Sequence, residues 1–367
     1  MRPSLDGKAA AMWKDRRILD LLRIELPIIQ APMAGANLSD MAIAVSEAGG
    51  LGSLPCAMLS LDKAREELSR IRLKTSKPIN VNFFCHRSPA VDAGREAAWK
   101  RRLKDYYLEL GLDPDMPTPP STRAPFDEAF LGLVEEFRPE VVSFHFGLPQ
   151  RGLLERVKKT GARVLSSATT VDEARWLEDE GCDAIIAQGF EAGGHRGIFL
   201  SDDLSTQVGT MALVPQVADA VKVPVIAAGG IADSRGIVAA FALGASAVQI
   251  GTAYLLTPEA TISPVHRQAL KSAEVEKTAL TNLFTGRPAR GIVNRLMREA
   301  GPLSELAPEF PLAGGAVAPL RQKSEPLGSG DFMPLWAGQA APLSRELSAG
   351  ELTKLLAEET LGRLSSR

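Results

Sequence analysis

Short apolar runs that alternate with helix-like segments constrain the fold of this sequence more than any other feature. Eight such runs occur between residues 27 and 250, and most are separated by stretches with helix-capping residues or terminal glycines. The expected strands are residues 27–30, 50–53, 79–83, 141–144, 163–166, 183–187, 223–227 and 247–250. Because such alternation implies parallel strands joined by right-handed crossovers, the pattern predicts an α/β protein with a (β/α)8 TIM barrel rather than an open, doubly wound sheet.

Helix boundaries are readable at two places. Asn37 or Ser39 can cap a helix that runs through Glu47 and ends at the Gly49-Gly50 pair. Thr170 can cap a helix over residues 171–180, which Gly181 would end. Both helices fit the connections that a barrel requires between successive strands.

Two long segments interrupt the alternation. Residues 86–125 contain a basic helix-like stretch around 99–107 followed by several prolines, and residues 256–334 mix helical pattern with glycine-rich and proline-rich loops. Either segment could cover the barrel mouth as a lid or a second lobe. We therefore expect a barrel over 1–255, completed by about 335–367, a smaller substrate or lid lobe over 256–334, and an inserted loop over 86–125 near the mouth.

Composition restricts the partners. A formal net charge of −2 provides no basic field for nucleic acid or an anionic membrane surface, so a small-molecule substrate is favoured. Three cysteines without CxxC spacing and four scattered histidines indicate neither disulfides nor a metal site. Basic residues such as Arg2 and Lys8 lie in an N-terminal stretch without an apolar core, and no apolar run of membrane-spanning length occurs, which predicts a cytoplasmic protein. No heptad pattern decides whether it forms homo-oligomers.

The loop after the run 183–187 is the strongest candidate for a reactive site. It reads Gln-Gly-Phe-Glu-Ala-Gly-Gly-His-Arg-Gly over residues 188–197. Glycines let a backbone approach a ligand closely, and histidine exchanges protons near neutral pH. His195 is therefore a candidate base beside a cofactor, although a histidine satisfied by backbone groups in a glycine turn is the alternative.

Two further loops point to phosphate binding. Gly229-Gly230 follows the seventh expected strand and leads into a helix, and Gly251-Thr252 follows the eighth. In barrels these two loops commonly bind phosphate through backbone amides and a helix N-terminus. The alternative is that the glycines only turn the chain tightly.

Amide side chains stand at the same predicted rim. Asn82, Gln188 and Gln249 can each donate and accept, which suits the edge of a flavin ring. A nicotinamide Rossmann site is disfavoured, because no Gly-x-Gly-x-x-Gly opens an early helix.

Together these motifs resemble those of the nitronate monooxygenases, formerly called 2-nitropropane dioxygenases. The resemblance covers nearly the whole chain. Its segments are residues 30–35, 48–52, 82–84, 188–197, 227–231, 249–252, 281–291, 328–331 and 335–339.

The resemblance implies an FMN-dependent barrel enzyme. Such an enzyme oxidises alkyl nitronates with O2, through a flavin semiquinone, to an aldehyde or ketone plus nitrite; use of neutral nitroalkanes stays open. By match to the motifs, His195 would be the catalytic base. The residues that would hold FMN are Met33, Asn82, Gln188, Gly193, Gly229, Gly230, Gln249, Ile250, Gly251 and Thr252.

Some positions depart from the family pattern or keep several interpretations. Ala36 replaces a usual second glycine, and His145 is an unusual strand residue for which packing or hydrogen bonding is favoured over catalysis. Arg196 could pair with a phosphate, a substrate anion or a carboxylate such as Glu191, which could itself orient His195 or cap a loop. For Arg290, Arg321 and Lys323, solvated charge is favoured over binding an anionic substrate; His86 and His266 lack a supporting constellation.

Two other functions remain possible on this frame. One is an FMN-dependent NAD(P)H reductase of the same superfamily, acting on an enoyl-acyl carrier protein or a quinone. Arg196 directly after His195, together with segments 285–291 and 335–339, favours the nitronate oxidase. The other is a flavin-binding protein without turnover, which the presence of His195 disfavours.

Overall fold

The barrel is an eight-stranded parallel sheet in a computed structural model that describes residues 13–121 and 123–366. Its strands are β1 (Ile28–Gln30), β2 (Gly52–Pro55), β3 (Ile79–Phe84), β4 (Val141–His145), β5 (Arg163–Ala168), β6 (Ala184–Gln188), β8 (Val225–Ala228) and β9 (Ala247–Ile250). They pair in the order β1-β9-β8-β6-β5-β4-β3-β2, and a parallel bridge between Ile29 and Leu51 joins the two ends. All eight predicted strands are confirmed, and the fold is a TIM barrel.

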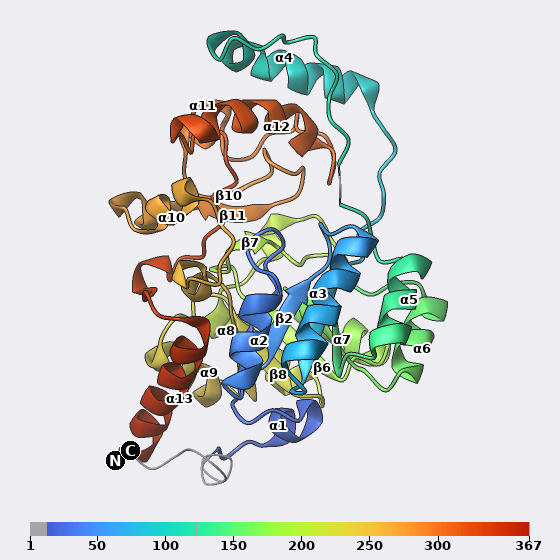
Figure 1. Cartoon of the computed structure of the whole chain (residues 1–367), viewed down its shortest axis with the longest axis vertical. Helices are drawn as coiled ribbons and strands as arrows, with labels where there is room; N and C mark the ends of the chain where they lie inside the picture. The colour runs from blue at the N-terminus through green and yellow to red at the C-terminus, as the bar shows by residue number, and fades with distance from the viewer. Residues whose placement is uncertain (1–12, 122, 367) are drawn as a thin grey trace.

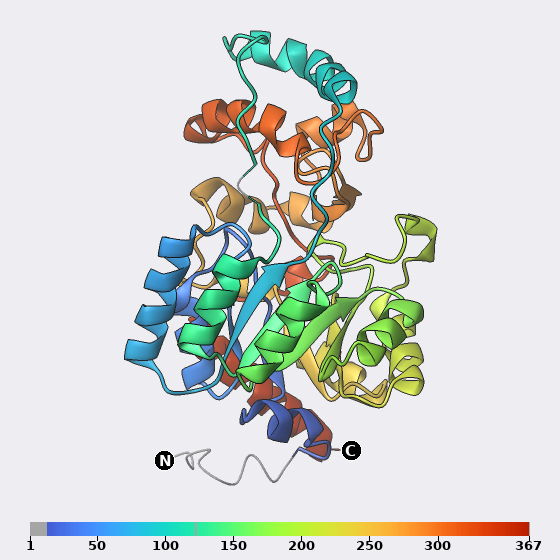
Figure 2. The ribbon, with the colours of Figure 1, turned by 90° about the vertical axis from the view of Figure 1, so that its right-hand side faces the viewer.

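Helices surround the sheet, as Figures 1 and 2 show. They are α1 (Arg17–Leu22), α2 (Ser39–Glu47), α3 (Leu61–Lys74), α5 (Glu128–Phe137), α6 (Arg151–Lys159), α7 (Val171–Asp179), α8 (Thr210–Ala220), α9 (Ser234–Ala242) and α13 (Ala349–Ser365). The C-terminal helix α13 packs between α2 and α9, where its Leu352 and Leu356 are fully buried. The end of the chain therefore covers the barrel beside its first and last strands.

One of the two predicted caps is correct. Thr170 accepts a hydrogen bond from the backbone amide of Glu173 and caps α7. Neither Asn37 nor Ser39 caps α2, whose N-cap position is Leu38. Asn37 instead binds the Met33 amide and the Ser53 carbonyl, and Ser39 binds Glu67 on α3. Both side chains connect neighbouring elements, which a local sequence pattern does not reveal.

A second, smaller lobe stands over the carboxyl ends of the strands. Its sheet is antiparallel and consists of β10 (Thr278–Thr281), β11 (Ala289–Ile292) and the two-residue strand β7 (Gly194–His195). Its helices are α4 (Ala93–Glu109), α10 (Pro264–Leu270), α11 (Arg295–Ala300) and α12 (Ala313–Ser324). Short 3-10 helices span Leu204–Thr206, Thr252–Leu256, Ala273–Glu276, Glu325–Leu327 and Ala341–Leu343.

The segment 86–125 contributes α4 to this lobe, and the helix predicted around 99–107 is confirmed. Trp99 donates from Nε1 to the Ala313 carbonyl at 3.1 Å, and Tyr107 donates to the Ala316 carbonyl at 2.6 Å. Both aromatic side chains belong to a hydrophobic core that is separate from the barrel core. In Figure 2, α4 lies on the side of the lobe farthest from the barrel, so only the ends of the segment pass the barrel mouth.

None of the helices in the described part of the chain is both long and apolar enough to span a bilayer. The basic residues Arg2 and Lys8, on which the localisation prediction drew, lie outside the described residues.

Candidate active site

A cavity of about 600 Å³ lies between the barrel mouth and the lobe. This volume is in the range of ordinary small-molecule sites. Nearly all of the predicted site residues line it: Met33, Asn82, Gln188, Gly193, His195, Gly229, Gly230, Gln249, Gly251 and Thr252. Ile250 is the exception, because its side chain is 1% exposed and packs in the barrel core.

The loop after β8 presents unused backbone donors to this cavity. Gly229 and Gly230 have φ values of 103° and 70°, and a Cβ on Gly229 would lie 3.0 Å from the Ala192 amide nitrogen. Within the described residues, no hydrogen bond uses the amides of Gly229, Gly230 or Gly251. The first backbone amides of α9 are not free, because the Asp233 side chain accepts hydrogen bonds from the amides of Arg235 and Gly236. An anion here would therefore be bound by the loop amides rather than by the helix end.

The three amide side chains differ in how much hydrogen-bonding capacity they keep. Gln188 donates to the His195 carbonyl at 3.0 Å and accepts from the Gly197 amide at 2.7 Å, so it holds the reactive loop. Asn82 donates to the Ser143 hydroxyl at 2.9 Å. Gln249 Oε1 is buried and has no hydrogen-bond partner among the described residues. A buried acceptor without a donor is uncommon, so Gln249 fits a ligand that carries an N–H or O–H group.

These features fit the cofactor that the sequence implies. A flat ring with a polar edge would satisfy Gln249, and the free amides after β8 and β9 suit a phosphate. Thr252 adds a hydroxyl that accepts from the Gly338 amide at 3.0 Å and so keeps its own proton for donation. No group of three or more His, Cys, Asp or Glu side chains that could hold a metal ion was found among residues 13–121 and 123–366.

His195 is carried by β7, whose partner strand β11 belongs to the lobe. Its Nε2 lies 3.0 Å from Thr285 Oγ1, and its carbonyl accepts from Gln188. Aromatic rings of Phe84, Phe146, Phe310 and Trp336 surround the imidazole, with centroids 5.3 to 6.1 Å away. The imidazole therefore has a defined orientation at the edge of the cavity.

Burial and neighbouring cations keep this imidazole neutral. Desolvation lowers the pKa of His195 well below its ordinary value, and Arg123, His145 and Arg287 lower it further. The main groups that shift the pKa are cations and other histidines. The surroundings of His195 therefore favour an anionic ligand and oppose a protonated imidazole.

His145 has the packing and hydrogen-bonding role that the sequence favoured. Its Nε2 lies 3.3 Å from the His195 carbonyl, and its Nδ1 lies 3.1 Å from Ser167 Oγ. Because a carbonyl only accepts, Nε2 carries the proton and Nδ1 accepts from Ser167. Burial lowers the pKa of His145 to about 3, so this ring is neutral and both of its nitrogens are occupied.

Phe146 follows His145 in an unusual conformation. Its backbone φ is 70°, in a region that residues other than glycine rarely adopt. The conformation places the ring 6.0 Å from His195 and under the Arg287 guanidinium, whose Cζ is 4.3 Å from the ring centroid. Arg287 also donates to the Ile198 carbonyl, so this cation is fixed beside the reactive loop.

Arg196 matches none of its three predicted pairings. Its guanidinium is fully buried and donates to the carbonyls of Gln188 and Gly189 and to Gln207 Oε1 at 2.6 to 2.9 Å. Burial lowers its pKa to about 10. Three oxygens brought together by the fold satisfy Arg196, and its role is to hold the loop that carries His195.

Other charged candidates also have structural partners. Glu191 accepts from the Thr210 amide and hydroxyl at the start of α8, so it caps an element rather than orienting His195. The expectation of a solvated charge is wrong for Arg290, which is 3% exposed and donates to the Phe190 carbonyl. Arg321 pairs with Glu325 at 3.1 Å while lining the cavity. Lys323 is exposed, as expected for a solvated charge.

Several cavity residues were not predicted from the sequence. Arg123 lines the cavity from the 86–125 segment, and no ion pair or side-chain hydrogen bond joins its guanidinium to another described residue. His266 lines it too, with Nε2 3.1 Å from the Trp336 carbonyl. Trp336 lines the cavity and Thr285 contacts His195. Both lie in segments that carry the family resemblance, which was a usable signal, whereas Arg123 lies in no motif.

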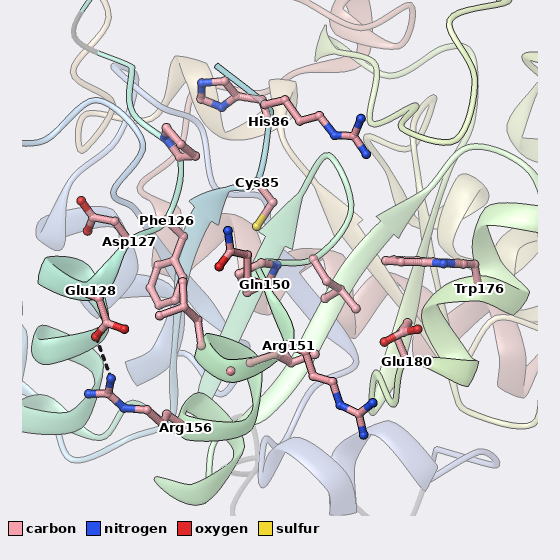
Figure 3. Close-up of a pocket in the computed structure, with 17 residues that line it drawn as sticks. Cys85, His86, Phe126, Asp127, Glu128, Gln150, Arg151, Arg156, Trp176 and Glu180 are labelled. Carbon is pink, nitrogen blue, oxygen red and sulfur yellow. Dashed lines mark hydrogen bonds and ion pairs between the residues drawn. The ribbon is translucent and has the colours of Figure 1, made fainter. Parts of the chain in front are cut away.

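A second cavity, of about 860 Å³, opens on the side of the barrel near the starts of α5 and α6 (Figure 3). It contains Cys85, Trp176 and the ion pair of Glu128 with Arg156. His86 also borders it; neither ring nitrogen has a hydrogen-bond partner in the described part of the chain, and burial lowers the pKa of His86 to about 4. None of the predicted site residues lines this cavity, so the candidate active site is the cavity that contains His195.

Comparisons with known proteins identify the family over nearly the whole chain. The family model described as nitronate monooxygenase matches residues 15–359. A nitronate monooxygenase of Pseudomonas aeruginosa is 44% identical over 349 residues, which cover 94% of this chain and 99% of the relative.

Two solved structures share the fold. A nitroalkane oxidase from Streptomyces ansochromogenes has a TM-score of 0.87 and 39% identity, covering 95% of this chain and 99% of that one. FabK from Thermotoga maritima has a TM-score of 0.71 and 29% identity, covering 95% and 97%. The chain is therefore similar over nearly its full length to proteins named for nitronate or nitroalkane oxidation.

Proposed function

Since this chain belongs to the nitronate monooxygenase family of oxidoreductases, we propose that it oxidises alkyl nitronates with O2, using FMN. The products would be an aldehyde or ketone and nitrite. One observation carries the proposal: the His195 imidazole borders a cavity lined by Arg123, and burial together with the cations Arg123 and Arg287 lowers its pKa, so that it is neutral. A nitronate is an anion, and such a cavity attracts it without protonating the imidazole.

The residues that would hold FMN follow from their free hydrogen-bonding groups. Amides of Gly229, Gly230 and Gly251 would bind the phosphate, and Gln249 Oε1 would accept from the ring edge. When bound, FMN supplies the electron-accepting ring for the oxidation. Met33 and Thr252 border the same space, and Gln188 supports the ligand indirectly by fixing the His195 loop.

His195 would manage the proton of the reaction. Its neutral ring can accept the α-proton of a nitroalkane or donate a hydrogen bond to the oxygens of a bound nitronate. The first role creates an imidazolium beside Arg123 and Arg287, which the site disfavours. We therefore expect preformed nitronates to be better substrates than neutral nitroalkanes.

The lobe would control access and substrate choice. We propose that residues 1–255 and about 335–367 form the FMN-binding part, while 256–334, joined by 86–125, form the substrate lobe. Three residues that line the cavity support this division. Arg123 comes from segment 86–125, Arg321 comes from segment 256–334, and Trp336 lies just after that segment.

An anaerobic absorbance experiment tests the function. The purified protein is mixed with propyl-2-nitronate in one cuvette and with NADH in a second, and the flavin bands are followed. Bleaching by nitronate alone, followed by nitrite release on adding air, is expected. Bleaching by NADH alone would assign the protein to the reductases of this superfamily. Missing flavin bands would contradict the cofactor, and bands that neither compound changes would indicate a flavin-binding protein without turnover.

A further inference from the structure

A single hydroxyl group lies between the reactive imidazole and a backbone carbonyl. Thr285 Oγ1 is 3.0 Å from His195 Nε2 and 3.3 Å from the Arg287 carbonyl oxygen. Thr285 is 1% exposed, so water does not compete for these contacts. The three atoms form a short chain from the loop between β10 and β11 to the catalytic ring.

The proton inventory of this chain has one fully satisfied arrangement. A carbonyl oxygen has no proton to give, and a threonine hydroxyl has one. If Thr285 donates its proton to the Arg287 carbonyl, its oxygen can accept only from an Nε2–H group on His195. With the proton on Nδ1 instead, Thr285 would have to donate to Nε2. Thr285 Oγ1 and the Arg287 carbonyl oxygen would then face each other without a hydrogen between them.

The other ring nitrogen is free. His195 Nδ1 makes no hydrogen bond with any described residue. Unlike Gln249 Oε1, which also has no partner there, this nitrogen is not fully buried. It therefore keeps accessible surface where His195 borders the cavity. His145 is the contrasting case, because both of its ring nitrogens are engaged by protein groups.

We propose that Thr285 is a positioning residue that holds His195 in the tautomer protonated at Nε2, which leaves the Nδ1 lone pair as the base. The role of Nδ1 as a base rests on the proposed function, whereas the tautomer does not. No role for Thr285 follows from the family resemblance, which covers the segment 281–291 without singling this residue out.

The proton transfer that this arrangement permits is balanced. The bond between the α-carbon and its hydrogen breaks, and its electron pair moves into the nitro group to form the nitronate. The proton forms a bond with Nδ1, and His195 becomes an imidazolium whose Nε2–H still points to Thr285. No electron is gained or lost in this step, so it requires no further reactant.

The tautomer can be measured directly on the purified protein. Incorporation of 15N-labelled histidine gives four ring patterns in a long-range proton–nitrogen NMR spectrum, and loss of one pattern in His195→Gln assigns the ring of interest. We expect a neutral ring protonated at Nε2 in the parent protein and in Thr285→Ser. In Thr285→Val the proton should distribute over both nitrogens, while the pattern of His145 stays unchanged.

Kinetics provide the second readout. Thr285→Val should lower kcat/KM for nitroethane by about 5- to 10-fold, the effect of one lost hydrogen bond, and should change kcat/KM for propyl-2-nitronate less. Thr285→Ser should restore the nitroethane activity, because it restores the hydroxyl.

Two results would overturn the proposal: a parent protein whose His195 proton resides on Nδ1, or a Thr285→Val protein with an unchanged tautomer. If Thr285→Val does not fold, the spectra of the parent and Thr285→Ser still decide the tautomer. If the parent oxidises no nitro compound, the proposed function fails, and the spectra remain decisive for Thr285.

Discussion

Individual side chains determine the charge that a substrate meets in this cavity. Arg287 lies over the Phe146 ring and donates to the Ile198 carbonyl, so its position is fixed by the protein. Arg123 has no such partner within the described part of the chain, although burial lowers its pKa. An arginine that lines a cavity without a counter-ion is available to an anionic substrate.

Replacing this cation should weaken nitronate binding. Arg123→Met should raise KM for propyl-2-nitronate by about 3- to 10-fold, as expected for the loss of about 1 kcal/mol of attraction. It should also make KM less sensitive to added salt. Steady-state kinetics at low and high ionic strength measure both effects.

Arg151→Met is the matched control, because Arg151 is 86% exposed and pairs with Glu155 outside the active-site cavity. Its KM should equal that of the parent protein. An unchanged KM in Arg123→Met would remove Arg123 from substrate binding.

The role of a single residue could be predicted when the groups that define this role are adjacent to it in the sequence. His195 was recognised because its flanking glycines are adjacent in sequence. Arg196 was misinterpreted, because the carbonyls of Gln188 and Gly189 that satisfy it become neighbours only when the loop folds back. Arg123 gave no signal, since its place in the cavity depends on the path of a long segment between β3 and α5.

At the scale of elements, the loop that carries His195 depends on close packing against α8. A Cβ on Gly189 would lie 1.8 Å from Thr210 Oγ1 and 2.4 Å from the Thr210 amide nitrogen. Thr210 begins α8 and is held there by the Glu191 carboxylate. The loop and the helix therefore have a contact that admits no side chain.

Two glycine substitutions test this contact. Gly189→Ala should destabilise the protein by about 2 to 4 kcal/mol and lower activity, because backbone and helix must separate. Gly132→Ala is the matched substitution: Gly132 lies within α5, and a Cβ added there would meet no other atom within 4 Å, so it should stabilise by about 0.5 to 1 kcal/mol. Urea unfolding followed by circular dichroism measures both. Equal effects of the two substitutions would contradict the packing argument.

Elements differed in how well the sequence predicted them. The barrel strands were predicted because each is a short apolar run between helical patterns, and this pattern reflects burial on both faces. The lobe sheet was not predicted, because β7 has two residues and β10 and β11 have four each, without clear alternation. Helix α4 was predicted, but its packing on α12 depends on residues more than 200 positions apart, such as Trp99 and Ala313, whose separation is 214.

At the scale of the whole molecule, the large barrel core and the main lobe core are separate, and two smaller hydrophobic clusters accompany them among the described residues. The separation of the two larger cores has a measurable consequence. Trp99 is 1% exposed in the lobe core, which shares no buried residue with the barrel core. Trp99→Ala should cost about 3 to 5 kcal/mol of local stability. Hydrogen exchange should then accelerate in α4 and α12 and stay unchanged in α5, α6 and α7. Acceleration of the same size in the barrel helices would show that the two cores unfold as one unit.

All four histidines of the chain have a lowered pKa, which predicts the response of the whole protein to acid. Burial is the largest cause for each; the values are about 4 for His86, about 3 for His145 and about 4 for His266, with His195 well below its ordinary value. Unfolded histidines titrate near 6.5, so between about pH 4.5 and 6.5 the unfolded chain binds more protons than the folded one. The free energy of unfolding should therefore fall as the pH falls through this range.

Each histidine contributes at most about 1.4 kcal/mol per pH unit to that slope. Urea midpoints at about pH 7.5 and pH 5 measure the difference, above the range in which most carboxylates titrate. His266→Gln, which keeps a donor for the Trp336 carbonyl, should make the dependence shallower. A midpoint that is the same at both pH values, or higher in acid, would contradict the prediction.

The pairing of β7 with β11 has a consequence for protein engineering. Because His195 lies on β7 and its partner strand comes from the lobe, the barrel and the lobe meet at the proposed base. A chimera that joins this barrel to the lobe of a relative would exchange Ala289, which is paired with His195 across the two strands, and Thr285, whose hydroxyl lies 3.0 Å from His195 Nε2. We therefore expect substrate range and proton transfer to change together, and recombination libraries should keep residues 188–197 and 281–291 from the same parent.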